Sequence, residues 1–360
     1  AMSERMVKQF MEMVQIDSES GEEAAMMEYL LREISALGGD AELDSYGNLI
    51  AKFPARGCEG KEPVLLSCHS DTVKPGKGIR PLLKDGIITS SGDTILGADD
   101  KAGIAEVLEA IRTGEVYPPL EFAVSRQEEV GLLGVKNLDF SKLSARMGFL
   151  MDNDTLETIV IGGPSYFAMD VTITGKAAHA GMEPEKGINA IYAASKAISA
   201  LSLGRLDHET TANVGVIEGG IIRNGVPDKV TFLAECRSAN HDKALALAQK
   251  MEETIQREGS STGCSVEVTV NNLWRTVSIP ADSPVVVIAQ EGLRSVGVEA
   301  KPVFITGFTD ASIYNNEGIS MAVVGIGARD EHSTHESISV NDMERALEAL
   351  KEMLRICATR

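Results

Sequence analysis

The spacing of apolar residues divides the chain into helical and alternating stretches. Apolar positions recur every three to four residues over 3–15 and 22–36, which predicts two amphipathic helices, the second ended by Gly38 and Gly39. Helical spacing returns at 101–112. Short apolar or alternating runs predict strands at 49–53, 64–67, 120–125 and 148–151. Strands that alternate with helices in this way predict an α/β sheet covered on both faces.

The pattern changes at about residue 166, where apolar and polar positions alternate over ten residues. Such alternation predicts a strand with one buried face. The elements that follow have the order strand-helix-strand-strand-helix-strand, which is typical of a ferredoxin-like sandwich. They are expected at 166–174, 187–201, 211–218, 229–235, 242–258 and 265–270. Further helices (283–296, 310–315, 340–357) and a strand (319–326) then resume the α/β pattern.

A chain of 360 residues exceeds what one core usually supports, so two domains are expected. The simplest arrangement is an α/β domain formed by 1–165 and 276–360, into which a ferredoxin-like α+β lid of 166–275 is inserted.

Charge and cysteine content narrow the function classes. The formal net charge of −19 argues against nucleic acid as a partner, since phosphate binding requires clustered Lys and Arg. No apolar run reaches the roughly 18 residues of a membrane span, and the first residues lack the apolar core of a signal peptide. The five cysteines contain no C-x-x-C pair, which fits a reduced compartment. We expect a cytoplasmic protein without a membrane segment.

The stretch GADDKAG (97–103) places Asp99 and Asp100 side by side before a helix. A surface turn that leads into a helix would explain one aspartate, because Asp is a good N-cap. Adjacent carboxylates repel one another unless a positive charge lies nearby, and a metal ion is the strongest candidate. The question is then whether other ligands converge on this turn.

Other candidate ligands follow predicted strands. His69 and Asp71 come after the strand at 64–67, and residues two apart on an extended chain project from the same face. A histidine that binds a metal usually donates its other ring N–H to a carboxylate, which Asp71 could provide. Glu128 and Glu129 follow the strand at 120–125, and Asp152 follows the strand at 148–151. Each of these pairs or single residues is common by chance.

Their shared position is what indicates a site. The carboxyl ends of strands in an open α/β sheet form its ligand-binding edge. A late segment, EHSTHE, adds His332 or His335. Three carboxylates balance most of the charge of two divalent ions, and Asp99 is the natural bridge between them. Imidazole mixed with carboxylates suits zinc, with cobalt or manganese as alternatives.

Seven motifs together resemble the co-catalytic zinc peptidases and deacylases, a family that includes peptidase T and acetylornithine deacetylase. They are HSDTV (69–73), GADDKAG (97–103), EEVGLLG (128–134), LMD (150–152), GKAAHAG (175–181), GG-x-x-x-N-x-x-PD (219–228) and H-x-x-x-E (332–336). The resemblance spans nearly the whole chain. GADDKAG, and an Asp at position 152 instead of Glu, are most similar to peptidase T and its shorter tripeptidase-like relatives.

The resemblance implies a role for each candidate residue. One zinc would be held by His69, Asp99 and Asp152, and the other by Asp99, Glu129 and His332. His332 is preferred to His335 because it stands four residues before Glu336. Glu128 would be the general base. Asp71, as the expected acceptor of the second ring N–H of His69, is also counted among the catalytic residues. The resemblance also implies a cis peptide between Asp99 and Asp100, with Asp100 helping to cap the following helix.

In the lid, the resemblance implies substrate contacts by His179, Asn224 and Arg237, and a homodimer formed through paired lids. We expect His179 to serve the active site of the partner subunit. One departure from the family lies at Phe308, where relatives commonly have a glycine of a glycine pair.

The predicted function is two-metal hydrolysis of amide bonds in short peptides, as in a tripeptide aminopeptidase. N-acyl-amino-acid deacylation or carboxypeptidase action would need the same metals and differ only in the lid contacts. A metal-binding dimerisation module without catalysis is a third reading, which the presence of Glu128 disfavours.

Overall fold

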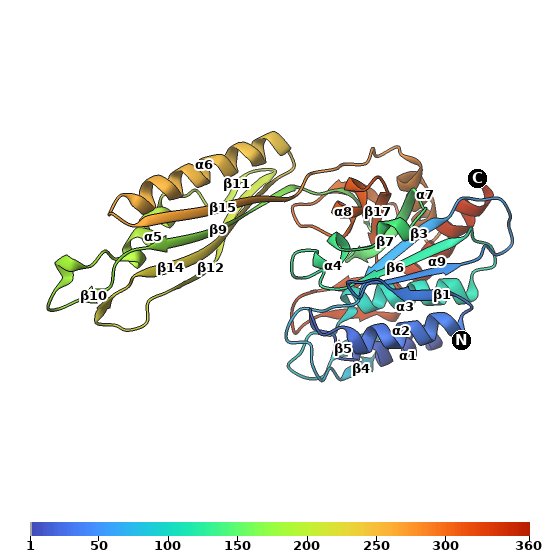
Figure 1. Cartoon of the computed structure of the whole chain (residues 1–360). Coiled ribbons are helices and arrows are strands. Elements are labelled where there is room, and N and C mark those ends of the chain that lie inside the picture. Colours follow the sequence, from blue (N-terminus) through green and yellow to red (C-terminus); the bar gives the residue numbers. More distant parts are fainter. Residues whose placement is uncertain (1) are drawn as a thin grey trace. The chain divides into compact units, whose positions relative to one another are not determined.

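The computed structural model of the chain describes residues 2–360 and divides into two compact units. The large unit contains the residues up to Gly162, Ser278–Phe304 and Thr309–Arg360. The lid unit contains Gly163–Val277 together with the short segment Ile305–Phe308. The first helices lie in the large unit, at the blue end of the chain in Figure 1.

The large unit is built around an eight-stranded sheet with the order β1-β2-β6-β3-β7-β17-β8-β16. Its central strands β3 and β6 are buried at every position, as expected for parallel strands covered on both faces. The strands are β1 (Asp40–Leu43), β2 (Leu49–Phe53), β3 (Val64–His69), β6 (Leu120–Ser125), β7 (Met147–Asn153), β8 (Thr158–Gly162), β16 (Lys301–Phe304) and β17 (Ser320–Gly325).

Helices cover this sheet and complete the main core. Helix α3 contacts both α1 and α9, and α7 packs beside α9. The helices are α1 (Met2–Val14), α2 (Ala24–Ala36), α3 (Ala98–Thr113), α4 (Leu133–Lys136), α7 (Pro284–Arg294), α8 (Ala311–Asn316) and α9 (Val340–Thr359). A second, four-stranded sheet contains β4 (Pro81–Lys84), β5 (Ile87–Ser90), β18 (Ala328–Arg329) and β19 (Ser337–Ser339).

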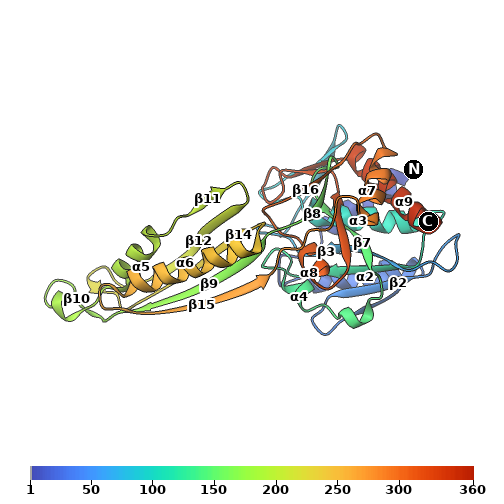
Figure 2. The ribbon, with the colours of Figure 1, turned by 90° about the horizontal axis from the view of Figure 1, so that it is seen from above.

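The lid unit is a five-stranded antiparallel sheet with the order β11-β12-β14-β9-β15, and two helices pack on it (Figure 2). Burial alternates along β9, which confirms the strand with one buried face. Its elements are β9 (Ser165–Thr174), α5 (Ala190–Ser199), β11 (Gly204–Asp207), β12 (Thr210–Gly219), β14 (Lys229–Ser238), α6 (His241–Ser260) and β15 (Ser265–Trp274). Two short strands, β10 (Ala178–His179) and β13 (Gly225–Val226), pair with each other.

The predicted fold class, an α/β domain with an inserted ferredoxin-like lid, is confirmed. Without β11, the first lid strand lies between the third and the fourth, which is the ferredoxin-like order. Several strands were not predicted, among them the inner strand β8 and the edge strands β1, β11 and β16. Each of these edge strands has only four residues and no buried apolar face. The assignment of Ile305–Phe308 to the lid unit was also not predicted.

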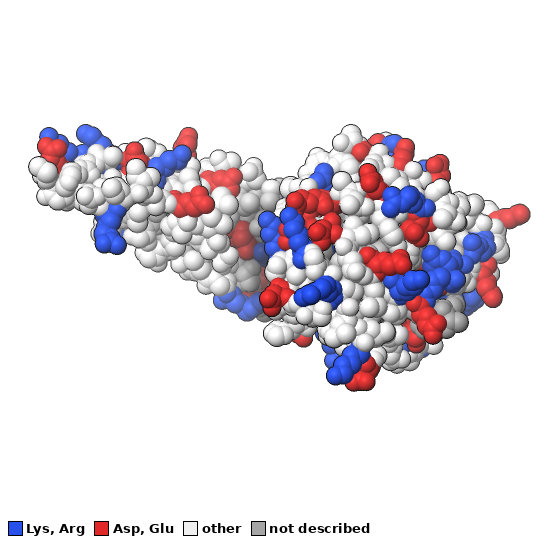
Figure 3. Space-filling model, turned by 90° about the horizontal axis from the view of Figure 1, so that it is seen from below, with Lys and Arg blue, Asp and Glu red and all other residues white. Residues whose placement is uncertain are grey.

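The surface of the large unit carries charges of both signs. Figure 3 shows Lys and Arg side chains beside Asp and Glu side chains over this unit, whereas the lid has a broad area without charged side chains. Within residues 2–360, no helix is both long and apolar enough to cross a membrane.

Candidate metal centre

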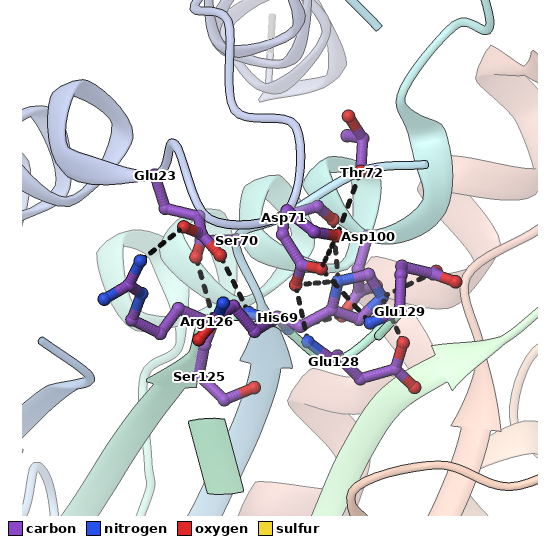
Figure 4. Close-up of polar contacts among 12 residues, drawn as sticks. Glu23, His69, Ser70, Asp71, Thr72, Asp100, Ser125, Arg126, Glu128 and Glu129 are labelled. Carbon is purple, nitrogen blue, oxygen red and sulfur yellow. Dashed lines mark hydrogen bonds and ion pairs between the residues drawn. The ribbon is translucent and has the colours of Figure 1, made fainter. Parts of the chain in front are cut away.

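Parallel pairing brings several predicted ligands to one edge of the large sheet. In the register of β3 and β6, His69 is the partner of Ser125, so the loop with Glu128 and Glu129 starts beside His69. Strand β7 also runs parallel to β3 and carries Asp152 near its carboxyl end. Figure 4 shows His69, Asp71, Asp100, Glu128 and Glu129 gathered close together. The predicted convergence at the carboxyl edge is what this topology produces.

The two histidines meet on Asp99. The Nε2 atom of His69 lies 2.9 Å from Asp99 Oδ1, and Nε2 of His332 lies 3.0 Å from Asp99 Oδ2. Each oxygen of the carboxylate therefore faces a different imidazole. His335, the alternative late ligand, is exposed, and its backbone N–H donates to Ser333 Oγ.

The remaining carboxylates complete two groups of donors. Nε2 of His69 lies 3.4 Å from Asp152 Oδ1 and 3.7 Å from Glu129 Oε1, and Nε2 of His332 lies 3.0 Å from Glu129 Oε2. Two atoms that both bind one tetrahedral zinc at about 2.0–2.1 Å lie roughly 3.3 Å apart. The observed separations bracket that value, so the donor set fits divalent ions. Groups of donors within 4.8 Å of one another include His69 with Asp99 and Glu129, and His69 with Glu128 and Asp152.

The electrostatics of the cluster also fit cations. Burial and neighbouring carboxylates raise the pKa of Asp152 and Glu128 well above the usual range, although His69 opposes this. Burial lowers the pKa of His69, but Asp152, Glu128 and Asp99 together raise it well above its usual value. Hydrogen bonds with Asp99 and Glu129 raise the pKa of His332 to about 11. The raised pKa values show that the cluster concentrates negative charge. Divalent ions would offset that charge.

Asp71 fixes the positions of three residues of the donor cluster. Nδ1 of His69 lies 2.8 Å from the carbonyl oxygen of Asp71 and 3.3 Å from its Oδ1, which leaves Nε2 facing the cluster. The same carboxylate accepts the backbone N–H groups of Glu128 at 3.0 Å and Glu129 at 3.1 Å (Figure 4). Burial would raise the pKa of Asp71, but hydrogen bonds with His69 and Ser20 lower it. Asp71 therefore orients one ligand and both glutamates.

The turn before α3 has the expected cis peptide between Asp99 and Asp100. Asp99 and Asp100 have non-helical backbone angles, so the regular part of α3 begins after them. Among the described residues Asp100 Oδ1 has no hydrogen-bond partner, so the expected side-chain cap by Asp100 is not formed. Asp100 instead accepts the backbone N–H of His69 at 3.1 Å and so holds the end of β3. Gly103 packs so closely on the Met151 carbonyl and on Asp100 that a Cβ would overlap both. The small residues of GADDKAG thus allow α3 to approach β7.

Two supporting residues were not predicted. Glu336 accepts backbone N–H groups from Leu96, Gly97 and Asp99, although the sequence indicated it only as a spacing partner of His332. Asp310 is buried beside β6, where its Oδ2 accepts the Ser125 hydroxyl at 2.5 Å, and burial raises its pKa to about 7. The H-x-x-x-E spacing was the sequence feature that could have predicted the supporting role of Glu336. For Asp310, the only such feature was its position in the loop that contains Phe308.

The predicted substrate-binding residues of the lid lie in two separate parts of it. Pairing of β10 with β13 brings His179 to Gly225, and the Ala180 N–H donates to the Asn224 carbonyl at 3.0 Å. Arg237 lies near the other end of β14, opposite Tyr166. Eight residues of strand, at about 3.3 Å each, separate Arg237 from the start of β14 and span roughly 26 Å. One lid therefore brings His179 and Asn224 together but keeps Arg237 away from them.

The hydrogen bonds of the His179 ring indicate which of its two nitrogens carries the hydrogen. Its Nδ1 accepts the backbone N–H groups of Gly181 at 3.1 Å and Met182 at 3.0 Å. An imidazole nitrogen that accepts carries no hydrogen, so the hydrogen of the neutral ring is on Nε2. The exposed Nε2–H of His179 is thus a donor.

The sequence and the fold both match known peptidases. Residues 164–262 match the family described as the peptidase dimerisation domain of the M20 peptidases. The uncharacterised protein YqjE of Bacillus subtilis is 35% identical over 98% of each chain. Among solved structures, a tripeptidase from Staphylococcus aureus superposes with a TM-score of 0.91, at 34% identity and 99% coverage of each chain. Aminopeptidase PepT from Bacillus cereus superposes with a TM-score of 0.86 at 36% identity, covering 99% of this chain and 100% of that one.

The similarities to YqjE, the tripeptidase and PepT extend over 98–99% of this chain and include both units. They confirm the resemblance to the peptidase T-like enzymes that the motifs indicated. The donor cluster of the large unit is consistent with a dinuclear metallopeptidase. The chain therefore belongs to the M20 peptidase family, in its peptidase T-like branch.

Proposed function

We propose that the protein is a two-metal aminopeptidase that removes the N-terminal residue of tripeptides. The observation that carries the proposal is the position of Asp99, whose two carboxylate oxygens face two different histidines. A carboxylate placed in this way is suited to bridge two ions. The similarity to a tripeptidase and an aminopeptidase over the full chain supports short peptides as substrates.

The metal ligands of this proposal are those expected from the motifs. His69, Asp99 and Asp152 would hold one ion, and Asp99, Glu129 and His332 the other. Zinc is the proposed metal, with cobalt or manganese as substitutes, because the donors are imidazole and carboxylate. When bound, two such ions polarise the scissile carbonyl and make water a stronger nucleophile.

Glu128 is proposed as the general base. Its Oε2 lies 3.7 Å from His69 Nε2, so its carboxylate borders the cluster, and Asp71 fixes its backbone. The attacking water forms a bond to the carbonyl carbon and transfers its proton to Glu128, which passes a proton to the amine nitrogen as the C–N bond breaks.

The Nε2–H of His179 is proposed to stabilise the oxyanion in the active site of a partner subunit. Along one lid, Arg237 lies roughly 26 Å from the start of β14, the strand end that follows the pairing of His179 with Gly225, whereas a tripeptide spans only about 10 Å. Both residues can contact one tripeptide only if two chains contribute. Asn224 lies beside the His179 segment, because its carbonyl accepts the Ala180 N–H, and would act with His179.

A homodimer through the lids would supply that second chain, and the match to a peptidase dimerisation domain supports it. Large apolar side chains are exposed on the lid in unusual number, which is typical of an interface. They include Ile191, Tyr192, Val216, Ile217, Ile221, Ile222 and Leu233. All five cysteines are free, which supports our placement of the enzyme in the reduced cytoplasm.

A hydrolysis screen tests the proposed substrate class. Protein loaded with zinc, cobalt or manganese is incubated with dipeptides, tripeptides, N-blocked tripeptides and N-acyl amino acids, and the released amines are identified. We expect tripeptides to lose their N-terminal residue and N-blocked forms to resist cleavage. Preferred cleavage of N-acyl amino acids would support the deacylase reading, and release of C-terminal residues the carboxypeptidase reading. Absence of hydrolysis with all three metals would support a non-catalytic module.

A further inference from the structure

The guanidinium of Arg237 is held in a fixed orientation inside the lid unit. Its Nε and Nη2 donate to the two carboxylate oxygens of Glu235 at 3.1 and 2.8 Å. Its Nη1 donates to the carbonyl oxygen of Thr306 at 3.2 Å. About four fifths of both side chains in this ion pair are buried, with 19% of Arg237 and 16% of Glu235 exposed. Two-point contact with a carboxylate fixes the plane of a guanidinium as well as its position.

An aromatic corner supports the same group. The Cζ atom of Arg237 lies 5.0 Å from the ring centroid of Tyr166 and 5.1 Å from that of Phe308. These two rings meet edge to face with centroids 5.4 Å apart, and Trp274 stacks on Tyr166 at 4.7 Å. Cations are attracted to such ring faces. Phe308, the departure from the family pattern, thus contributes directly to the surroundings of Arg237.

Part of the guanidinium remains available. It has five N–H groups, and three of them donate to Glu235 and Thr306. One N–H on each terminal nitrogen has no protein acceptor in the described part of the chain. Two N–H groups on neighbouring terminal nitrogens match the spacing of the two oxygens of a carboxylate.

We propose that Glu235 is a positioning residue that turns this free edge of Arg237 toward the C-terminal carboxylate of the peptide substrate. The pair then sets selectivity for peptides that end in a free carboxyl group. Without Glu235, the guanidinium keeps its charge but loses the contact that fixes its plane, so a carboxylate must order it on binding. This inference rests on the proposed function, since it requires a short peptide as the substrate.

The test compares a tripeptide with its C-terminal amide, using metal-loaded wild-type protein and the variants Glu235→Ala and Glu235→Gln. Loss of an oriented, charge-assisted contact costs about 1.5–3 kcal/mol, so we expect Glu235→Ala to raise KM for the free acid by roughly 10- to 100-fold. The KM for the amide should change little, and kcat for the acid should stay near the wild-type value. Glu235→Gln keeps one acceptor oxygen and should show an intermediate KM.

Two controls separate this effect from a general loss of structure. Glu267→Ala removes an exposed glutamate from β15 of the same sheet and should leave the KM ratio of acid to amide unchanged. Thermal unfolding of each variant reports on folding. Equal effects of Glu235→Ala on acid and amide, or a lower KM for the acid, would overturn the inference. Wild-type protein that cleaves neither peptide would instead overturn the proposed function.

Discussion

The carboxylate of Glu336 holds the backbone of Asp99. Its Oε2 accepts the Asp99 N–H at 3.0 Å, while its Oε1 accepts the N–H groups of Leu96 and Gly97 at 2.9 and 2.8 Å. Glu336 is buried and lies four residues after His332. The segment that provides one proposed ligand therefore also positions the loop of the proposed bridging ligand.

Glu336→Gln should weaken metal binding without removing any ligand. The amide nitrogen of Gln cannot accept an N–H, so at least one of the three backbone hydrogen bonds is lost. Changes to residues that orient metal ligands typically reduce affinity by about 10- to 100-fold. Competition with a chromophoric chelator measures the affinity. Affinity equal to that of the control variant Glu317→Gln, an exposed site at the end of α8, would contradict this role.

Asp99→Ala should remove both ions together. Because Asp99 faces His69 with one oxygen and His332 with the other, neither proposed site keeps its full set of donors. Metal analysis of gel-filtered protein measures the content, with the exposed Asp93→Ala as the matched control. One ion retained at full occupancy in Asp99→Ala would contradict the bridge.

Mixed dimers test the proposed action of His179 in a partner subunit. Chains with His179→Ala are exchanged with chains carrying Glu128→Gln, and activity is measured once exchange is verified. If His179 acts on the partner, a mixed dimer has one site with both defects and one with neither, so activity should return toward half of wild type. If it acts within its own chain, both sites stay defective and no recovery is seen.

Glu106 should make stability depend on pH. It is buried in α3, neither carboxylate oxygen has a hydrogen-bond partner within residues 2–360, and burial raises its pKa well above the usual value of 4.5. A carboxyl group whose pKa is raised in the folded state favours folding below its unfolded pKa, and this contribution is lost as pH rises.

As pH rises above the usual pKa of a glutamate, we therefore expect wild-type protein to lose up to about 1.4 kcal/mol per pH unit relative to Glu106→Gln, until the carboxyl group also ionises in the folded state. Urea denaturation of the two proteins without metal, compared at each pH, gives this difference. A difference that does not change with pH would contradict the assignment.

Sequence patterns predicted the parts of the site that depend on local rules. Because parallel strands share a carboxyl edge, the sequence alone places His69, Glu129 and Asp152 together. The choice of His332 came from its spacing to Glu336, but the hydrogen bonds of Glu336 depend on how a distant loop folds. The pairing of Arg237 with Glu235, and the contact of Arg237 with the Phe308 ring, depend likewise on side-chain geometry that residue spacing does not encode.

The most direct test of the account measures metal content and turnover on the same sample of Glu128→Gln. Glu128 lies close enough to His69 and Asp152 to bind an ion, so the variant separates a base from a ligand. We predict two ions per chain, unchanged folding, and tripeptide turnover slowed by at least about 10²- to 10⁴-fold, the usual contribution of a general base. Near-normal turnover with both ions bound, or loss of an ion from the variant, would contradict the assignment of Glu128 as the base of a two-metal peptidase.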